Sequence, residues 1–154
     1  MKTNQARRGF TLIEVLIVVV IMAVLAATII PQFTSSTRDA QNSSVKFNAH
    51  ALRSQIELYK AHHLGNLPKL ENDSLPQLLK ATDASGNLGD VKPDASHPFG
   101  PYLDDIPVNP FNNLKTVTSV PNPGTPPTKG TGASGWQYDQ TTGGIWPNHA
   151  DWVP

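Results

Sequence analysis

One unbroken apolar segment dominates the N-terminal part of the chain. Residues 10–30 contain a single charged residue, Glu14, and no Lys or Arg occurs between Arg8 and Arg38. At about 1.5 Å per residue, a helix of this length spans the roughly 30 Å hydrocarbon core of a bilayer. The pattern therefore predicts a membrane-spanning helix that is followed by a body outside the membrane.

The helical pattern continues beyond Pro31. Residues 33–64 contain no Pro or Gly, and largely apolar side chains recur there at spacings of three and four. Such spacing gives a helix one face that must pack against the rest of the chain. We expect one helix over residues 10–64, kinked at Pro31 because proline removes a backbone donor. The predicted buried stripe consists of Val45, Ala49, Leu52, Ile56, Tyr59 and His63.

A short second helix is expected after this long one. Gly65 and Asn66 are typical of a helix C-terminus, and Asp73 or Ser74 can cap a helix over residues 75–81. The side chains of this helix that are expected to face inward are Leu75, Leu78 and Leu79.

The C-terminal part favours short strands between loops. Alternating large and polar residues around a Gly-rich turn predict a hairpin over residues 136–146, and a strand is expected over residues 115–120. Residues 82–101 and 121–135 are rich in Gly, Pro and polar side chains, so we predict loops there, the second of them flexible. The predicted fold class is α+β, with the long kinked helix packed on a small antiparallel sheet.

Composition excludes several classes of protein. The 154 residues include 12 Lys and Arg, 12 Asp and Glu, and no Cys. The zero net charge gives no reason to expect a nucleic-acid partner, and disulfides and cysteine zinc sites are excluded. The five His form no HExxH motif, and no common catalytic fingerprint occurs. We therefore predict that the chain is not an enzyme.

Basic residues gather before the apolar segment. Residues 1–9 carry Lys2, Arg7 and Arg8 and no acidic residue. A basic flank usually stays cytoplasmic, so we expect a single-pass protein with its N-terminus inside and its C-terminal body outside the inner membrane.

Glu14 separates three interpretations of the apolar segment: a secretory signal peptide, a plain membrane anchor, or a segment cleaved between Gly9 and Phe10. A carboxylate in the bilayer costs about 2.5–3.5 kcal/mol at its centre, and the first two interpretations leave this cost without a reason. Cleavage would create an α-amine on Phe10, which lies four residues from Glu14 on the same helix face.

The stretch Arg7 to Glu14, RRGFTLIE, resembles the N-terminus of the type IV pilin superfamily, which includes the pseudopilins of type II secretion. Pro31 also falls where that family commonly carries a helix-kinking proline. The resemblance implies that a prepilin peptidase cleaves after Gly9 and N-methylates Phe10, and that Glu14 pairs with the amine of an adjacent subunit. It implies a leader over residues 1–9, a membrane or filament-core helix over 10–30 and a periplasmic domain over 31–154.

Two later segments narrow the resemblance. GPYLDDIPVNPF (100–111) and GWQYDQTTGGIW (135–146) are similar to segments of the major, G-type pseudopilins. The implied function is a structural subunit of a pseudopilus that polymerises at the inner membrane and drives type II secretion. Its implied partners are copies of itself, other pseudopilins, the prepilin peptidase and an inner-membrane assembly platform. A type IV pilin of a surface pilus and a non-polymerising exported binding domain with a pilin-type anchor remain as alternatives.

The same resemblance implies a calcium-binding site, because G-type pseudopilins typically bind one calcium ion near the C-terminus. Calcium takes six to eight oxygen ligands. The candidates are Asp139, Asn148 and Asp151, although the acid-rich loop of typical members is largely missing and only Asp151 and Trp152 match it. The alternative is that these residues are solvated or form turns. The three Trp are expected to lie in the core of the hairpin.

Overall fold

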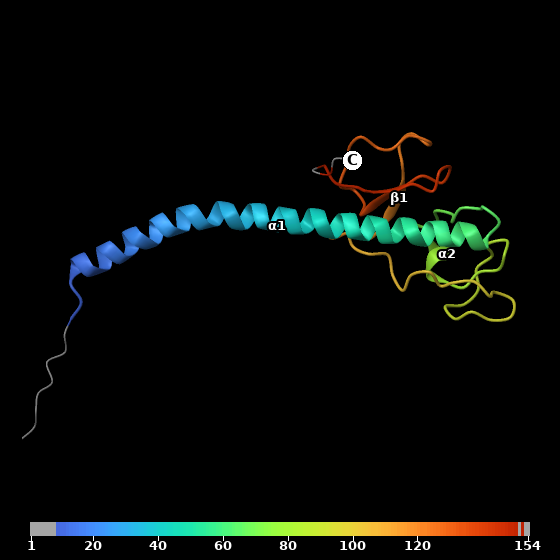
Figure 1. Ribbon diagram of the computed structural model, residues 1–154, viewed down its shortest axis with the longest axis horizontal. Helices are drawn as coiled ribbons and strands as arrows, with labels where there is room; N and C mark the ends of the chain where they lie inside the picture. The colour runs from blue at the N-terminus through green and yellow to red at the C-terminus, as the bar shows by residue number, and fades with distance from the viewer. Residues whose placement is uncertain (1–8, 151, 153–154) are drawn as a thin grey trace, which may run out of the picture. The chain divides into compact units, whose positions relative to one another are not determined.

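The computed structural model describes residues 9–150 and residue 152 (Figure 1). It contains helix α1 (Leu12–His62), helix α2 (Pro76–Leu79) and strands β1 (Val117–Ser119), β2 (Trp136–Tyr138) and β3 (Ile145–Pro147). These elements confirm the α+β class. The chain divides into two units, residues 1–40 and residues 41–154, and each is described by itself.

Helix α1 passes through both units as one element of 51 residues. It continues through Pro31, so the single long helix is confirmed, while the kink expected there stays a prediction. In the first unit its apolar side chains are exposed around the whole helix, which is unlike the one-sided pattern of a helix on a soluble core.

In the second unit, α1 buries the predicted stripe. All six stripe residues have exposed fractions of 4% or less, which confirms the prediction from spacing. This face packs against residues from α2, its flanking turn and the sheet, so the core lies between α1 and the segments that follow it. The partners in this cluster include Leu75, Leu78, Ile106, Val117, Trp136, Tyr138 and Ile145.

The C-terminus of α1 is closed by a left-handed turn. The Gly65 N–H donates to the Lys60 carbonyl at 2.9 Å, and Leu64 between them has a φ of 56°. This is the i to i+5 bond of a Schellman-type helix end, in which the left-handed residue is usually Gly. The predicted end of the helix is therefore confirmed, but Leu64 rather than Gly65 occupies the first left-handed position.

Helix α2 is shorter than expected, and its cap differs. It begins at Pro76, with Leu75 as N-cap and no side-chain cap. Asp73 lies in a left-handed turn with a φ of 53°, and Ser74 forms a backbone bridge with Glu71, so the predicted caps were wrong. Proline fits the first helical turn because its missing N–H has no intrahelical partner there.

The sheet is mixed rather than antiparallel, with the order β1-β2-β3. The hairpin of β2 and β3 is antiparallel as predicted, with Tyr138 opposite Ile145. Strand β1, in contrast, runs parallel to β2, with Val117 opposite Trp136. A parallel pair needs a crossover of about a dozen residues or more, and the Pro- and Gly-rich segment between β1 and β2 supplies it. The prediction of a wholly antiparallel sheet is thus corrected.

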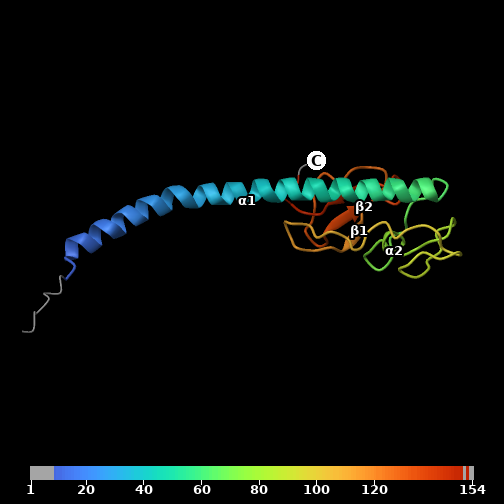
Figure 2. The same ribbon diagram turned by 60° about the horizontal axis from the view of Figure 1, so that its bottom comes forward.

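The segment 107–110 connects α1 to the sheet. Its carbonyl groups accept hydrogen bonds from both sides: the Trp136 Nε1–H donates to Pro107 O at 2.7 Å, and the Asn48 amide donates to Val108 O at 3.1 Å. In Figure 2 this segment runs below α1 beside β1. The prolines of this region therefore belong to an ordered connection.

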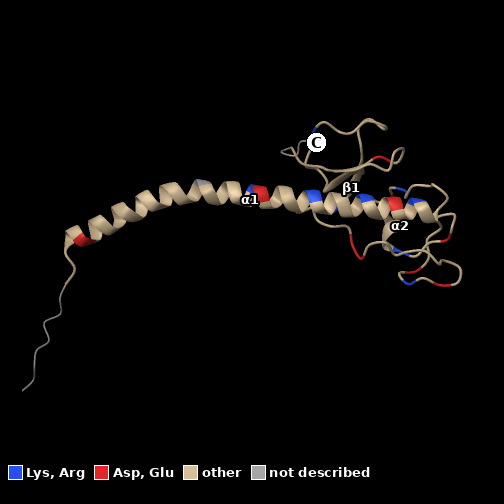
Figure 3. Ribbon diagram, viewed as in Figure 1, with Lys and Arg blue, Asp and Glu red and all other residues tan. Residues whose placement is uncertain are grey.

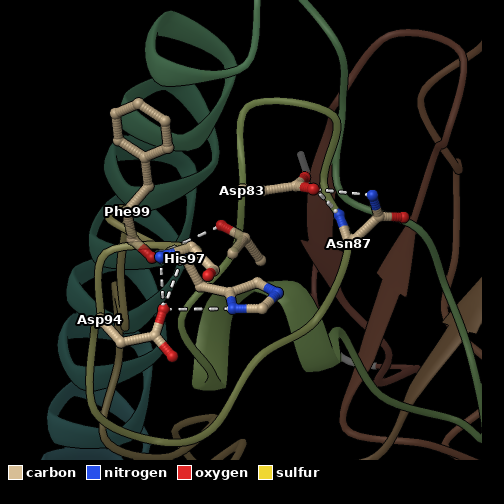
Figure 4. Close-up of polar contacts among 7 residues, drawn as sticks. Asp83, Asn87, Asp94, His97 and Phe99 are labelled. Atoms are coloured by element: carbon tan, nitrogen blue, oxygen red, sulfur yellow. Dashed lines mark hydrogen bonds and ion pairs between the residues drawn. The ribbon is translucent and has the colours of Figure 1, made fainter.

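The loop over residues 82–99 is shaped by two carboxylates (Figure 4). Asp83 accepts hydrogen bonds from the backbone and side-chain N–H groups of Asn87 at 2.9 and 2.7 Å. Asp94 accepts one from the His97 backbone N–H at 2.6 Å, and its carboxylate lies 3.3 Å from His97 Nδ1. These acids stabilise local turns, which agrees with the loop expected here.

Candidate assembly site at the N-terminus of the long helix

The first turn of α1 is closed by reciprocal hydrogen bonds between Thr11 and Glu14. The Thr11 backbone N–H and its hydroxyl each donate to Glu14 Oε2 at 2.7 Å, and the Glu14 N–H donates to Thr11 Oγ1 at 3.3 Å. Since α1 begins at Leu12, Thr11 is the N-cap and Glu14 the third helical residue. This is a capping box, in which two otherwise unpaired backbone donors are satisfied.

This cap was not predicted, although the Thr-x-x-Glu spacing before an apolar run is its usual signal. Glu14 consequently has a local role as well as the predicted assembly role. The two roles make different demands, because a cap needs only an acceptor oxygen, whereas pairing with an amine needs a negative charge.

The surface around this turn is apolar and exposed. Phe10 is 88% exposed and Leu12 is 82% exposed, and the apolar side chains after them share this exposure. The mean hydropathy of the most apolar window of α1 reaches 3.0, and its side chains make no internal core. By length and composition, α1 can cross a membrane. Glu14 is the one charged side chain among residues 10–30.

The predicted cleavage point lies directly before this turn. Gly9 and Phe10 are both exposed and precede the first helical residue. No other part of the structure lies within 4 Å of a side-chain carbon built on Gly9, so nothing described covers the peptide bond. Arg7 and Arg8 lie outside the described residues.

Asp139 does not fit the predicted calcium site. Its carboxylate is buried and already accepts four hydrogen bonds: from the Thr141 N–H at 2.9 Å and hydroxyl at 2.6 Å, from the Gly124 N–H at 2.7 Å and from the Thr142 hydroxyl at 2.9 Å. Four donors around one carboxylate occupy the positions a cation would need. The residue instead joins the end of β2 to the loop that contains Gly124.

Asn148 lies at the other end of the same hairpin. It follows β3 and sits beside Gly135, to whose carbonyl its backbone N–H donates at 3.0 Å, whereas Asp139 follows β2 and bonds Gly144. The side-chain oxygen of Asn148 accepts hydrogen bonds from the Thr131 N–H at 2.6 Å and from the Gln137 amide at 2.7 Å. The structure therefore does not bring Asp139 and Asn148 together, and in this arrangement they cannot share one ion.

The third candidate ligand, Asp151, lies outside the described residues. Within residues 9–150 and 152, no three His, Asp or Glu side chains are grouped so as to hold a metal ion. The Trp prediction also needs correction. Trp136 is fully buried, but Trp146 in β3 and Trp152 in the tail after the hairpin are only half-buried, and both line a surface pocket.

An exposed stretch at Gly9 and Phe10, a membrane-length apolar helix with one carboxylate in its first turn, and a small α+β body are the features of a prepilin-like protein. Residues 4–30 match the family model described as the prokaryotic N-terminal methylation motif.

Relatives that align over most of the chain carry the assignment further. The chain is 32% identical to type II secretion system core protein G of Pseudomonas aeruginosa over 112 residues, which cover 71% of this chain and 72% of that protein. It is 28% identical to core protein G of Klebsiella pneumoniae over 71% of this chain and 72% of that one. With core protein G of Vibrio cholerae it shares 26% identity over 93% of this chain and 92% of that one. No solved structure matches the chain.

The chain belongs to the type II secretion system core protein G family and is a pseudopilin subunit of that system. Members of this family are structural proteins. The motif and the apolar helix indicate that the chain is anchored in a membrane.

Proposed function

We propose that this pseudopilin is made as a precursor, is cleaved between Gly9 and Phe10 by a prepilin peptidase that also N-methylates Phe10, and polymerises at the inner membrane. The filament of its copies and of other pseudopilins would extend from an assembly platform and drive type II secretion. Family membership and the methylation motif over residues 4–30 support this proposal.

The observation that carries the proposal is the position of Glu14. It is the one charged group in an exposed apolar segment, where a carboxylate costs about 2.5–3.5 kcal/mol or more at the bilayer centre. Cleavage removes the three positive charges of the leader and creates a single α-amine on Phe10, one helical turn away. The cap donates two neutral hydrogen bonds to Glu14 Oε2 and leaves the negative charge uncompensated, so this charge is available to the amine of an adjacent subunit.

The same segment supports the proposed topology. The basic leader stays in the cytoplasm, residues 10–30 cross the membrane and the body after Pro31 lies in the periplasm. Removing the leader leaves no Lys or Arg before Arg38. The helix can therefore move from the bilayer into a filament core without transferring a basic side chain across the membrane.

Three variants of the first turn test the function. Glu14→Gln keeps an acceptor for the capping box but removes the charge, Glu14→Ala removes both, and Thr11→Val removes the hydroxyl half of the cap while keeping the charge. We expect both Glu14 variants to abolish filaments and secretion, and Thr11→Val to weaken them only modestly. The measurement is electron microscopy of filaments together with the secreted fraction of a substrate. Normal filaments from Glu14→Gln would contradict the proposal and leave Glu14 with its capping role alone.

A further inference from the structure

A basic pocket lies in the second unit between α1 and the C-terminal hairpin. It has a volume of about 340 Å³. Its lining includes Lys46, His50 and Arg53 from successive turns of α1, and Trp146 and Trp152 from the C-terminal segment.

Among the described residues that line this pocket, no acidic side chain compensates the positive charge. Lys46 and His50 are exposed, and neither has a hydrogen-bond or ion-pair partner in the part of the chain that the structure describes. Arg53 is half-buried, and its Nε and Nη2 groups both donate to the Ile145 carbonyl, at 3.2 and 3.0 Å. Arg53 therefore joins α1 to β3 at the wall of the pocket, while Lys46 and His50 are exposed and can contact a ligand. No described lining residue is acidic.

The complementary charge lies elsewhere in the same unit. Residues 71–105 contain seven acidic side chains against two basic ones, a net charge of −5. Figure 3 shows the acidic residues of these loops together with a few basic ones, and both acidic and basic residues along α1. Asp90 and Asp104 are exposed and have no described side-chain partner, unlike Asp83 and Asp94, which stabilise turns.

We propose that the pocket between α1 and the hairpin receives the acidic 71–105 surface of a second copy of this chain. The two surfaces differ in place and in sign, so the contact is heterologous: each copy offers its pocket to one neighbour and its acidic surface to another. Such contacts propagate into an open polymer when the rotation does not close a ring. A symmetric pair of pockets would instead bring like charges together.

This inference rests on the proposed function, because it assigns the contact between neighbouring bodies in the filament. Trp146 and Trp152 supply apolar area beside the cations, and aromatic residues are enriched at the centre of protein interfaces. The outer charges set the register and the rate of association more than the final affinity, so the contact should weaken as salt is raised.

Cysteine cross-linking tests the contact directly, since the chain has no native Cys. Lys46→Cys is combined with Asp104→Cys, and separately with Asp90→Cys, in the full-length chain assembled in cells. We expect oxidation to give a ladder of dimers, trimers and longer species from at least one pair. The matched control, Lys46→Cys with Lys129→Cys, joins two basic positions and should give about tenfold less product.

Charge reversal supplies an independent measurement. Lys46→Glu should lower filament yield about tenfold, and Asp104→Lys or Asp90→Lys in the same chain should restore it. Normal filaments from Lys46→Glu, together with no ladder from either cysteine pair, would overturn this contact and leave the proposed function standing. A wild-type chain that forms no filaments would overturn the proposed function itself.

Discussion

Asp139 connects two segments of the body through one carboxylate. Burial by itself would raise the pKa of Asp139, but hydrogen bonds from Thr141, Gly124 and Thr142 outweigh it and lower the pKa to about 2. The ordinary value in an unfolded chain is about 3.9. The charged form is therefore favoured by folding, and the residue works as a structural acceptor.

Replacing Asp139 should destabilise the body. Asp139→Ala leaves buried donors unpaired, and Asp139→Asn turns an amide N–H toward other donors, so each is expected to cost about 2–3 kcal/mol. Thermal melting of the full chain in detergent measures the loss, with Thr141→Val, which removes one hydroxyl donor, as the milder comparison. Melting temperatures unchanged in both Asp139 variants would contradict this assignment.

The lowered pKa also predicts a dependence on pH. A depressed folded-state pKa gives stability that is fully present above the unfolded value and is lost as the pH falls through the folded one. We therefore expect the Asp139 contribution to disappear between about pH 4 and pH 2. Over this window, the free energy of unfolding should fall more steeply for the wild type than for Asp139→Asn, and equal slopes would exclude the effect.

Residue-level chemistry at the assembly site was only partly predictable. Gly9, Phe10 and Glu14 lie together at the start of α1 because the chain is continuous there, while their roles in cleavage, methylation and assembly stay predictions. Of the predicted calcium ligands, Asp139 and Asn148 are not brought together, because they follow antiparallel strands and so lie at opposite ends of the hairpin. Their hydrogen-bond donors, Gly124 and Thr131, come from a loop whose path the sequence pattern does not determine.

At the scale of elements, α1 was the most predictable part. Its buried stripe follows from the 3.6-residue period, which is a local property of the sequence. The direction of β1 was not predictable, because residues 120–135 carry turn signals that fit a return in either direction. Helix α2 is shorter than predicted mainly at its C-terminus, where Lys80 adopts an extended conformation with a φ of −128° and a ψ of 161°.

The end of α1 offers a test at this scale. Leu64 is 89% exposed and has a φ of 56°, a conformation that costs a non-Gly residue roughly 1–2 kcal/mol. Leu64→Gly should therefore stabilise the helix end by about 0.5–1 kcal/mol after the greater entropy loss of Gly is subtracted. A rise of a few degrees in melting temperature is expected, while Asn66→Gly, outside this position, is the control. A lower melting temperature for Leu64→Gly would contradict the left-handed turn.

On the scale of the whole molecule, the proposed topology places the C-terminal body outside the cytoplasm. A cysteine at Thr128, an exposed position in the β1–β2 loop, should react with a membrane-impermeant maleimide in intact spheroplasts. A cysteine at Thr3 in the leader should stay unlabelled until the cells are lysed, in a strain without the peptidase. The absence of native Cys makes both signals specific. Labelling of Thr3→Cys before lysis would contradict this topology.

The central claim is that this pseudopilin is a processed prepilin, and the N-terminus of the membrane-extracted protein tests it most directly. Intact mass and N-terminal peptide mass spectrometry should show a mature chain that begins at a methylated Phe10. In a strain without the peptidase, the same measurement should return Met1 through Gly9 attached and Phe10 unmethylated. A chain that begins near Ala27, as expected if the apolar segment is an ordinary signal peptide, would contradict the claim. A chain that keeps its leader in cells with active peptidase would contradict it as well.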